Sequence, residues 1–289
     1  MAVKLTDGAQ LGVTNHDRDA VAKRYVYPVV SRRAGGVSVG VNLNPNNACN
    51  WRCQYCQVPN LVRGKGPPID GQLLARELDE MLQDIVHGDF MLRRVPAHAR
   101  QLKDIALSGN GEPTTSPHLG EAIEIIAEAL DHFELLGRVE VVLITNGSML
   151  DQPKVQDAVR RLSSLNGQVW FKLDAATAEG MERINGSKTT VQRQLARLRR
   201  AARLCDTLIQ TCLVAWDGRP PSEDELRAYL DILGRLADDQ NAPSAVLLYT
   251  LARPPQQPDA GRLSALSHEW LGDLGRRIEA TGIPVKVID

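Results

Sequence analysis

Residues 44–56 read NPNNACNWRCQYC, which places Cys49, Cys53 and Cys56 within eight residues at C-x3-C-x2-C spacing. Clustered cysteines without a secretory context bind metal or react more often than they form disulfides. Thiolates are the usual protein ligands of iron–sulfur clusters, and this spacing lets a loop wrap one corner of a cubane. Three cysteines leave the fourth iron without a protein ligand, as a catalytic zinc keeps one open position.

Structural zinc is the alternative interpretation of this loop. Such sites usually take four protein ligands, often from two C-x2-C pairs. The remaining cysteines, Cys205 and Cys212, do not form a second pair of that spacing, and only His16 or His118 would be left to complete the set. The pattern favours a cluster, and we expect Cys205 and Cys212 to pack as small buried residues.

Apolar runs alternate with longer helical patterns along the rest of the chain, which predicts right-handed βαβ units around a parallel sheet. The expected strands are 37–43, 104–107, 139–145, 169–173, 208–214, 245–251 and a short seventh at 284–288. The expected helices are 72–86, a segment from Ser116-Pro117 to Leu130, 152–162, 191–202, a segment from a capping box at Ser222 to Leu236, and 268–280. The fold class is therefore α/β: a partial (β/α)6 TIM-type barrel over residues 36–289, preceded by an irregular extension over residues 1–35. An open doubly wound sheet is the structural alternative.

Polar motifs follow the second, third and fourth of these strands. The first reads Ser108-Gly109-Asn110-Gly111-Glu112-Pro113, where glycines allow close backbone approach and Glu112 can accept hydrogen bonds from an ammonium group. An ordinary turn would have a similar composition. Because the carboxyl ends of barrel strands share one rim, we expect this motif to lie beside the cysteine loop.

The next two motifs are Asn146, in a Thr-Asn-Gly sequence, and the pair Lys172 and Asp174. Asn146 is a candidate ligand contact or simply an Asn-Gly turn. Residues two apart on a strand face the same side, so Lys172 and Asp174 either contact a ligand or satisfy each other as an ion pair. Gln210 and Tyr249 are weaker candidates that would otherwise be plain core.

The cysteine spacing, with aromatic Tyr55 before the last cysteine, resembles the signature of the radical S-adenosylmethionine (SAM) superfamily. The glycine–glutamate turn resembles its GGEP motif with Asn110 inserted, and the Lys-x-Asp sequence resembles the activating-enzyme and wyosine-type branches. The resemblance implies a 4Fe–4S cluster on the three cysteines, with SAM chelating the open iron. It implies cofactor contacts from the polar motifs, at Tyr55, Ser108, Gly109, Asn110, Gly111, Glu112, Asn146, Lys172 and Asp174.

The implied chemistry is reductive cleavage of SAM to a 5′-deoxyadenosyl radical, which abstracts hydrogen from a substrate. Such an enzyme needs an external one-electron reductant of the flavodoxin or ferredoxin type. With two cysteines left over, a second 4Fe–4S cluster is not expected. We expect a small-molecule substrate; an activating enzyme for a partner protein and a wyosine-like RNA-modifying enzyme are the alternatives.

Composition sets the remaining limits. The 289 residues carry a formal charge of -1, which argues against broad nucleic-acid binding, although a basic helix face at Arg193, Arg197, Arg199, Arg200 and Arg203 leaves RNA contact possible. We expect that face to be solvated. No secretory leader or membrane-spanning run is recognisable, so the expected location is cytoplasmic, without membrane association.

Overall fold

The computed structural model describes residues 10–12 and 23–288. The helices are α1 Gly71–Val86, α2 Phe90–Arg94, α3 Leu119–His132, α4 Pro153–Ser163, α5 Ala178–Asn185, α6 Val191–Leu204, α7 Glu223–Ala237 and α8 His268–Glu279. The strands of the main sheet are β1 Val26–Ser31, β2 Gly36–Val41, β5 Leu102–Leu107, β6 Glu140–Thr145, β7 Gly167–Lys172, β8 Asp206–Cys212, β10 Ala245–Tyr249 and β12 Val285–Ile288. Two short ribbons pair β3 Ala48–Cys49 with β4 Val62–Arg63, and β9 Ala215–Trp216 with β11 Leu263–Ser264.

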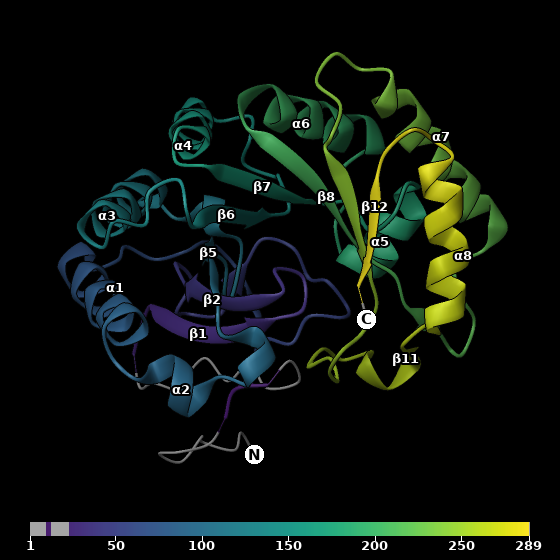
Figure 1. The fold of residues 1–289 in the computed structure, drawn as a ribbon. Helices are drawn as coiled ribbons and strands as arrows, with labels where there is room; N and C mark the ends of the chain where they lie inside the picture. Colours follow the sequence, from purple (N-terminus) through teal and green to yellow (C-terminus); the bar gives the residue numbers. More distant parts are fainter. Residues whose placement is uncertain (1–9, 13–22, 289) are drawn as a thin grey trace.

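The main sheet of the described chain has the order β1-β2-β5-β6-β7-β8-β10-β12, and every pair from β2 onward is parallel. Figure 1 shows this sheet curled into an arc with the long helices on its outer side. The predicted partial barrel, including the short seventh parallel strand, is confirmed. The open doubly wound alternative is wrong, because such a sheet would carry helices on both faces.

The main hydrophobic core lies between the outer face of the sheet and the helices. Strand residues such as Val39, Ile105 and Val141 are fully buried there against helix residues such as Leu78 and Ile126. A smaller apolar cluster, formed by Ala106, Val142, Trp170, Leu247 and Ile288, is separate from that core. These residues alternate with the outer ones along their strands, so they occupy the inner side of the arc.

The prediction of an irregular extension over residues 1–35 is wrong for its last part. Residues 26–31 form β1, which pairs antiparallel with β2. The buried carboxylate of Glu77 in α1 accepts hydrogen bonds from the backbone N–H groups of Arg24, Tyr25 and Val26 at 2.8–3.2 Å. The hydrogen bonds that hold this segment come from a helix residue about fifty positions away, so the local sequence alone does not predict the strand.

Two helix predictions need correction. Helix α3 begins at Leu119 rather than at Pro117. Residues 113–115 form a short 3-10 turn, and the α-helix starts only after it. Helix α5 was not predicted at all. The capping box at Ser222 is confirmed: its side chain accepts a hydrogen bond from the backbone N–H of Glu225, and the Glu225 carboxylate accepts one from that of Ser222.

The basic face of α6 is less solvated than predicted. Asp151 forms ion pairs with Arg193, Arg197 and Arg200, and the side chain of Arg197 is only 7% exposed. Much of the positive charge on this face is therefore neutralised by ion pairs with Asp151. In the described residues, no helix is long and apolar enough to cross a membrane.

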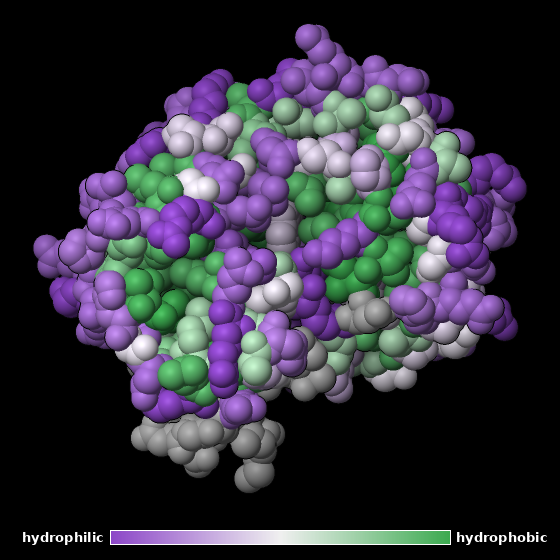
Figure 2. Space-filling view, viewed as in Figure 1, coloured by the Kyte–Doolittle hydropathy of each residue, from purple (hydrophilic) through white to green (hydrophobic). Residues whose placement is uncertain are grey.

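Figure 2 shows the face of Figure 1 in space-filling form. Polar side chains dominate the outline, and apolar side chains are visible between them nearer the middle.

Candidate active site

The cysteine loop follows β2 and lies across the carboxyl ends of the strands. Cys49, Cys53 and Cys56 are all free thiols that line one cavity of about 230 Å³. The loop is fastened to α5 by backbone hydrogen bonds, from Arg52 to Asn185 at 2.9 Å and from Gln54 to Ile184 at 2.8 Å. An unpredicted helix therefore holds the loop in place.

Two of the three thiols, Cys49 and Cys53, are strongly disfavoured as free thiolates. Partial burial, followed by the charge of Glu112, raises the pKa of Cys49 to about 12. Burial also raises the pKa of Cys53 to about 12, although Lys172 and a hydrogen bond from Asn185 oppose the shift. A bound metal centre supplies the positive charge that ionises such thiols.

Three cysteine thiols are the donor set that a 4Fe–4S cluster takes. Within the described residues, no three His, Cys, Asp or Glu side chains converge closely enough to hold one metal ion. A cubane is larger than an ion and spreads its thiolates further apart. Of the two histidines considered for zinc, His118 contacts Glu121 through its ring at 2.6 Å, and His16 lies outside the described residues.

Glu112 lies 3% exposed at the end of the glycine turn. Its carboxylate accepts hydrogen bonds from the backbone N–H groups of Thr114 and Asn146, and from the hydroxyls of Thr114 and Thr145. Burial raises the pKa of Glu112, whereas these bonds lower it. The carboxylate is thus held at the cavity wall by Thr114 of the 3-10 turn and by Thr145 and Asn146 at the end of β6.

The glycines of this turn are required by the cysteine loop. A Cβ on Gly111 would overlap the backbone carbonyl oxygen of Ala48, and Gly109 has a φ of +141° beside the Asn42 side chain. Gly111 therefore has no room for a side chain, and Gly109 has a backbone conformation that only glycine adopts readily. Asn110 joins the two segments directly, because its Nδ2 donates to Oδ1 of Asn47 at 2.7 Å.

Asn146 also faces the cysteine loop. Its side-chain Nδ2 donates to Oδ1 of Asn50 at 2.9 Å, and its Oδ1 accepts from the N–H of Ser148. Ser108 contacts the hydroxyl of Tyr27 in β1 at 2.9 Å. The predicted rim residues therefore lie together around the cysteine loop, while their contacts with a cofactor stay predictions.

Lys172 and Asp174 meet at Tyr55 rather than at each other. Lys172 Nζ donates to the Tyr55 hydroxyl at 2.8 Å, and that hydroxyl donates to Asp174 Oδ2 at 2.5 Å. Asp174 also accepts from Asn185 Nδ2 at 2.7 Å and from the N–H of Cys212 at 2.8 Å. Burial alone would lower the pKa of Lys172, but Tyr249, Asp174 and Cys53 raise it overall.

Asn185 is the main site residue that the sequence did not reveal. Its Nδ2 lies 3.4 Å from Cys53 Sγ as well as bonding Asp174. The available signal was the Asn185-Gly186 step, where Gly186 ends α5 with a φ of +56°. That step also fits an ordinary helix end, so only the fold connects it with the cysteines.

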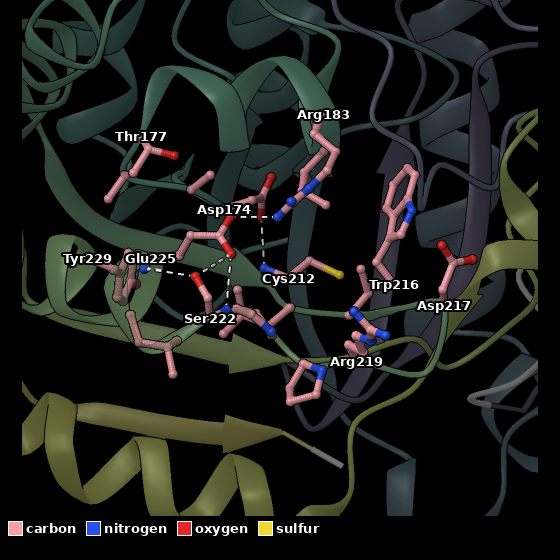
Figure 3. A pocket seen from close by; sticks show the side chains of 18 residues that line it. Asp174, Thr177, Arg183, Cys212, Trp216, Asp217, Arg219, Ser222, Glu225 and Tyr229 are labelled. Carbon is pink, nitrogen blue, oxygen red and sulfur yellow. Dashed lines mark hydrogen bonds and ion pairs between the residues drawn. The ribbon is translucent and has the colours of Figure 1, made fainter.

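A second cavity, of about 470 Å³, lies on the other side of Asp174. Figure 3 shows Asp174 and Cys212 on one wall, with Tyr229, Ser222 and Glu225 on another. The two cavities differ in chemistry, since the larger one is lined by none of the clustered cysteines and by no part of the glycine turn. We therefore place the candidate site in the smaller cavity.

Comparison with known proteins gives a consistent result. A sequence model described as the radical SAM superfamily matches residues 43–231. A UPF0026 protein from Helicobacter pylori (strain ATCC 700392 / 26695) is 30% identical over 163 residues, which cover 55% of this chain and 44% of the relative. A UPF0026 protein from Synechocystis sp. (strain PCC 6803) is 30% identical over 162 residues, covering 55% and 52%. The chain thus matches about half the length of these relatives.

Two solved structures share the fold. A radical SAM methyltransferase from Sphaerobacter thermophilus superposes with a TM-score of 0.59 and 17% identity, covering 87% of this chain and 66% of that chain. HydG, a maturase of the FeFe-hydrogenase, gives a TM-score of 0.54 and 13% identity, covering 86% and 50%. At these identities the likeness concerns the curled sheet and its helices.

Proposed function

The chain belongs to the radical SAM superfamily, and on that premise we propose that it is an enzyme that cleaves SAM reductively and abstracts hydrogen from a small molecule. The observation that carries the proposal is the grouping of three free thiols on one wall of a cavity that continues into the inside of the barrel. The C-x3-C-x2-C motif supplies three thiolates, which would leave one iron of a 4Fe–4S cluster for the cofactor.

The cofactors of this superfamily are a 4Fe–4S cluster and SAM. When bound, they supply a one-electron cleavage that yields a 5′-deoxyadenosyl radical, with electrons from an external flavodoxin- or ferredoxin-type donor. Cys49, Cys53 and Cys56 would hold the cluster, and their donor chemistry fits it.

The surrounding residues bind, orient and exclude water. Glu112 offers a fixed carboxylate for an ammonium group, because Thr145 and Asn146 restrain it. Lys172 places a positive charge beside the thiols. Trp51 is 5% exposed and lines the same cavity as the three cysteines, where its indole would exclude water.

The test is anaerobic reconstitution with iron, sulfide, reductant and SAM, followed by measurement of 5′-deoxyadenosine and methionine. We expect both products from the wild type and neither from Cys53→Ala. The matched control is Cys205→Ala, since Cys205 is 4% exposed, its thiol donates to the carbonyl of Gly167, and it does not line the cysteine cavity. Equal product from wild type and Cys53→Ala would refute the proposal.

The substrate class is tested by transfer of deuterium from candidate metabolites into 5′-deoxyadenosine. Transfer from a small molecule without any added protein supports the proposal. Transfer that requires a stoichiometric protein partner or an RNA would instead identify an activating or RNA-modifying enzyme.

A further inference from the structure

The inner side of the barrel carries a buried amide with no partner. Gln210 lies in β8, in register with Lys172 on β7 and Leu247 on β10, and its side chain lines the cysteine cavity. It is 0% exposed. Neither its Nε2 nor its Oε1 has a hydrogen-bond partner among the described residues.

Other buried glutamine side chains have at least one hydrogen-bond partner within the protein. Gln257 donates to the carbonyl of Val58 at 3.0 Å, and Gln194 donates to the carbonyl of Asn146 at 2.8 Å. Gln210 is the only buried side-chain amide in the described residues with both polar atoms unpaired. A buried polar group without a partner is costly, so a position that keeps one is a candidate for ligand recognition.

The walls around Gln210 suit a flat group. Trp170 and Tyr249 line the same cavity, and the guanidinium of Arg33 lies 5.5 Å and 5.4 Å from their ring centroids. Trp170 belongs to the inner apolar cluster that includes Leu247 and Ile288, and Tyr249 packs against that cluster. Aromatic walls beside a buried amide favour a planar group that presents a donor beside an acceptor.

The depth of Gln210 separates it from the rim. Glu112, Asn146 and Asp174 all follow the ends of their strands, whereas Gln210 lies two residues before the end of β8. The cofactor must meet the cysteine loop at the rim. Gln210 is level with Lys172, the last residue of β7, so a group that reaches it lies two residues deeper than Asp174 on the inner side of the arc, and we assign that level to the substrate.

We propose that Gln210 is a specificity-determining residue that binds a planar amide or lactam edge of the substrate through both its Nε2 and its Oε1. This assignment rests on the proposed function, because it takes the rim to be the cofactor site. The substrate would be a compact molecule with a flat carboxamide or lactam group that lies in the cavity lined by Trp170, Tyr249 and Arg33.

The first test asks whether replacing Gln210 raises or lowers the thermal stability of the ligand-free protein. Gln210→Met should leave the thermal midpoint of the ligand-free protein unchanged or raise it, because the substitution removes an unpaired amide. The matched control Gln257→Met should lower the midpoint, because it breaks the bond to Val58. A fall of about 5 °C or more in Gln210→Met would show a structural role and overturn the proposal.

The second test uses uracil and nicotinamide as probes, against pyrimidine and pyridine as rings without the amide. Binding is measured by ligand-observed NMR on reconstituted protein with SAM present. We expect the amide probes to bind better than their matched rings, and Gln210→Met to weaken them about tenfold. Equal binding of amide and non-amide rings, or no effect of Gln210→Met, would overturn the proposal.

Calorimetric titration with SAM separates substrate from cofactor. We expect SAM affinity to be the same in wild type and Gln210→Met, and a parallel loss would assign Gln210 to the cofactor adenine instead. If the proposed function is wrong, the wild type forms no 5′-deoxyadenosine. The stability and probe measurements still decide the role of Gln210 in that case.

Discussion

The hydroxyl of Tyr55 in the cysteine loop donates a hydrogen bond to the carboxylate of Asp174, 119 residues later in the chain, at 2.5 Å. The same hydroxyl accepts a hydrogen bond from Lys172. One phenol thus joins the loop that carries the thiols to the end of β7. Asp174 then continues the network to Asn185, which contacts Cys53.

Removing this phenol should loosen the cysteine loop. Tyr55→Phe leaves Lys172 without its hydroxyl acceptor and takes one of three donors from Asp174, so we expect a loss of about 1–3 kcal/mol in the free energy of unfolding. Urea denaturation of the ligand-free protein measures it. Tyr249→Phe is the control, since it keeps a ring on the same cavity and no hydrogen bond of its hydroxyl is found in the described structure. Equal effects of the two substitutions would argue against the network.

The contact between Asn185 and Cys53 should tune the cluster. Hydrogen bonds to cluster sulfurs stabilise the reduced state, so Asn185→Ala should make the reduction potential more negative and slow SAM cleavage. Redox titration followed by electron paramagnetic resonance measures the shift. Ser187→Ala, a buried substitution two residues away, should leave the potential unchanged. An unchanged potential in Asn185→Ala would place its role in the Asp174 network alone.

Asp104 should make stability depend on pH. It is 1% exposed, and burial, aided by the charge of Glu140, raises its pKa from 3.8 to about 6, while Ser38 and Arg33 oppose the shift. The folded state therefore holds this proton more tightly than the unfolded state. As the pH rises from about 4 to about 6, this group should lower the free energy of unfolding by up to about 3 kcal/mol.

Asp104→Asn removes that dependence, because its side chain does not ionise and can still accept the bond from Ser38. Above pH 6 the variant should be more stable than the wild type, and near pH 4 the two should be similar. Denaturation across this pH range measures it, with the exposed Asp131→Asn as control. Parallel pH profiles for Asp104→Asn and the wild type would contradict the expectation.

Glu77 should anchor β1 to the rest of the sheet. Glu77→Gln turns an NH2 group toward one of the backbone N–H donors of residues 24–26, so we expect a loss of about 2 kcal/mol or more. Hydrogen exchange should rise across β1. Glu80→Gln, an exposed residue one turn along α1 that pairs with Lys23, should leave β1 protected. Unchanged exchange in Glu77→Gln would mean that pairing with β2 alone holds the strand.

Much of the fold follows from local patterns. Continuous apolar runs identified the seven parallel strands, because strands buried on both faces lack polar alternation. The capping box at Ser222 fixed a helix start through contacts between residues three apart. Where the decisive contact is distant, prediction failed, because β1 depends on Glu77 in α1. The start of α3 was missed for a local reason, since the 3-10 turn at residues 113–115 delays the helix.

The sequence by itself determined the chemistry of the site. The spacing of Cys49, Cys53 and Cys56 predicts thiol ligands one short of a full set, and the strand-end motifs predict that Glu112, Asn146 and Asp174 share one rim. Ligand type and strand order are properties of the chain, so they can be read along it.

Only the tertiary structure decided how these groups are connected and which others join them. It showed Tyr55 bridging Lys172 and Asp174, Asn185 beside Cys53, and Gln210 unpaired on the inner wall. Whether a buried polar group is satisfied depends on atoms from strands and helices far apart in sequence. That is a property of packing, and no local pattern encodes it.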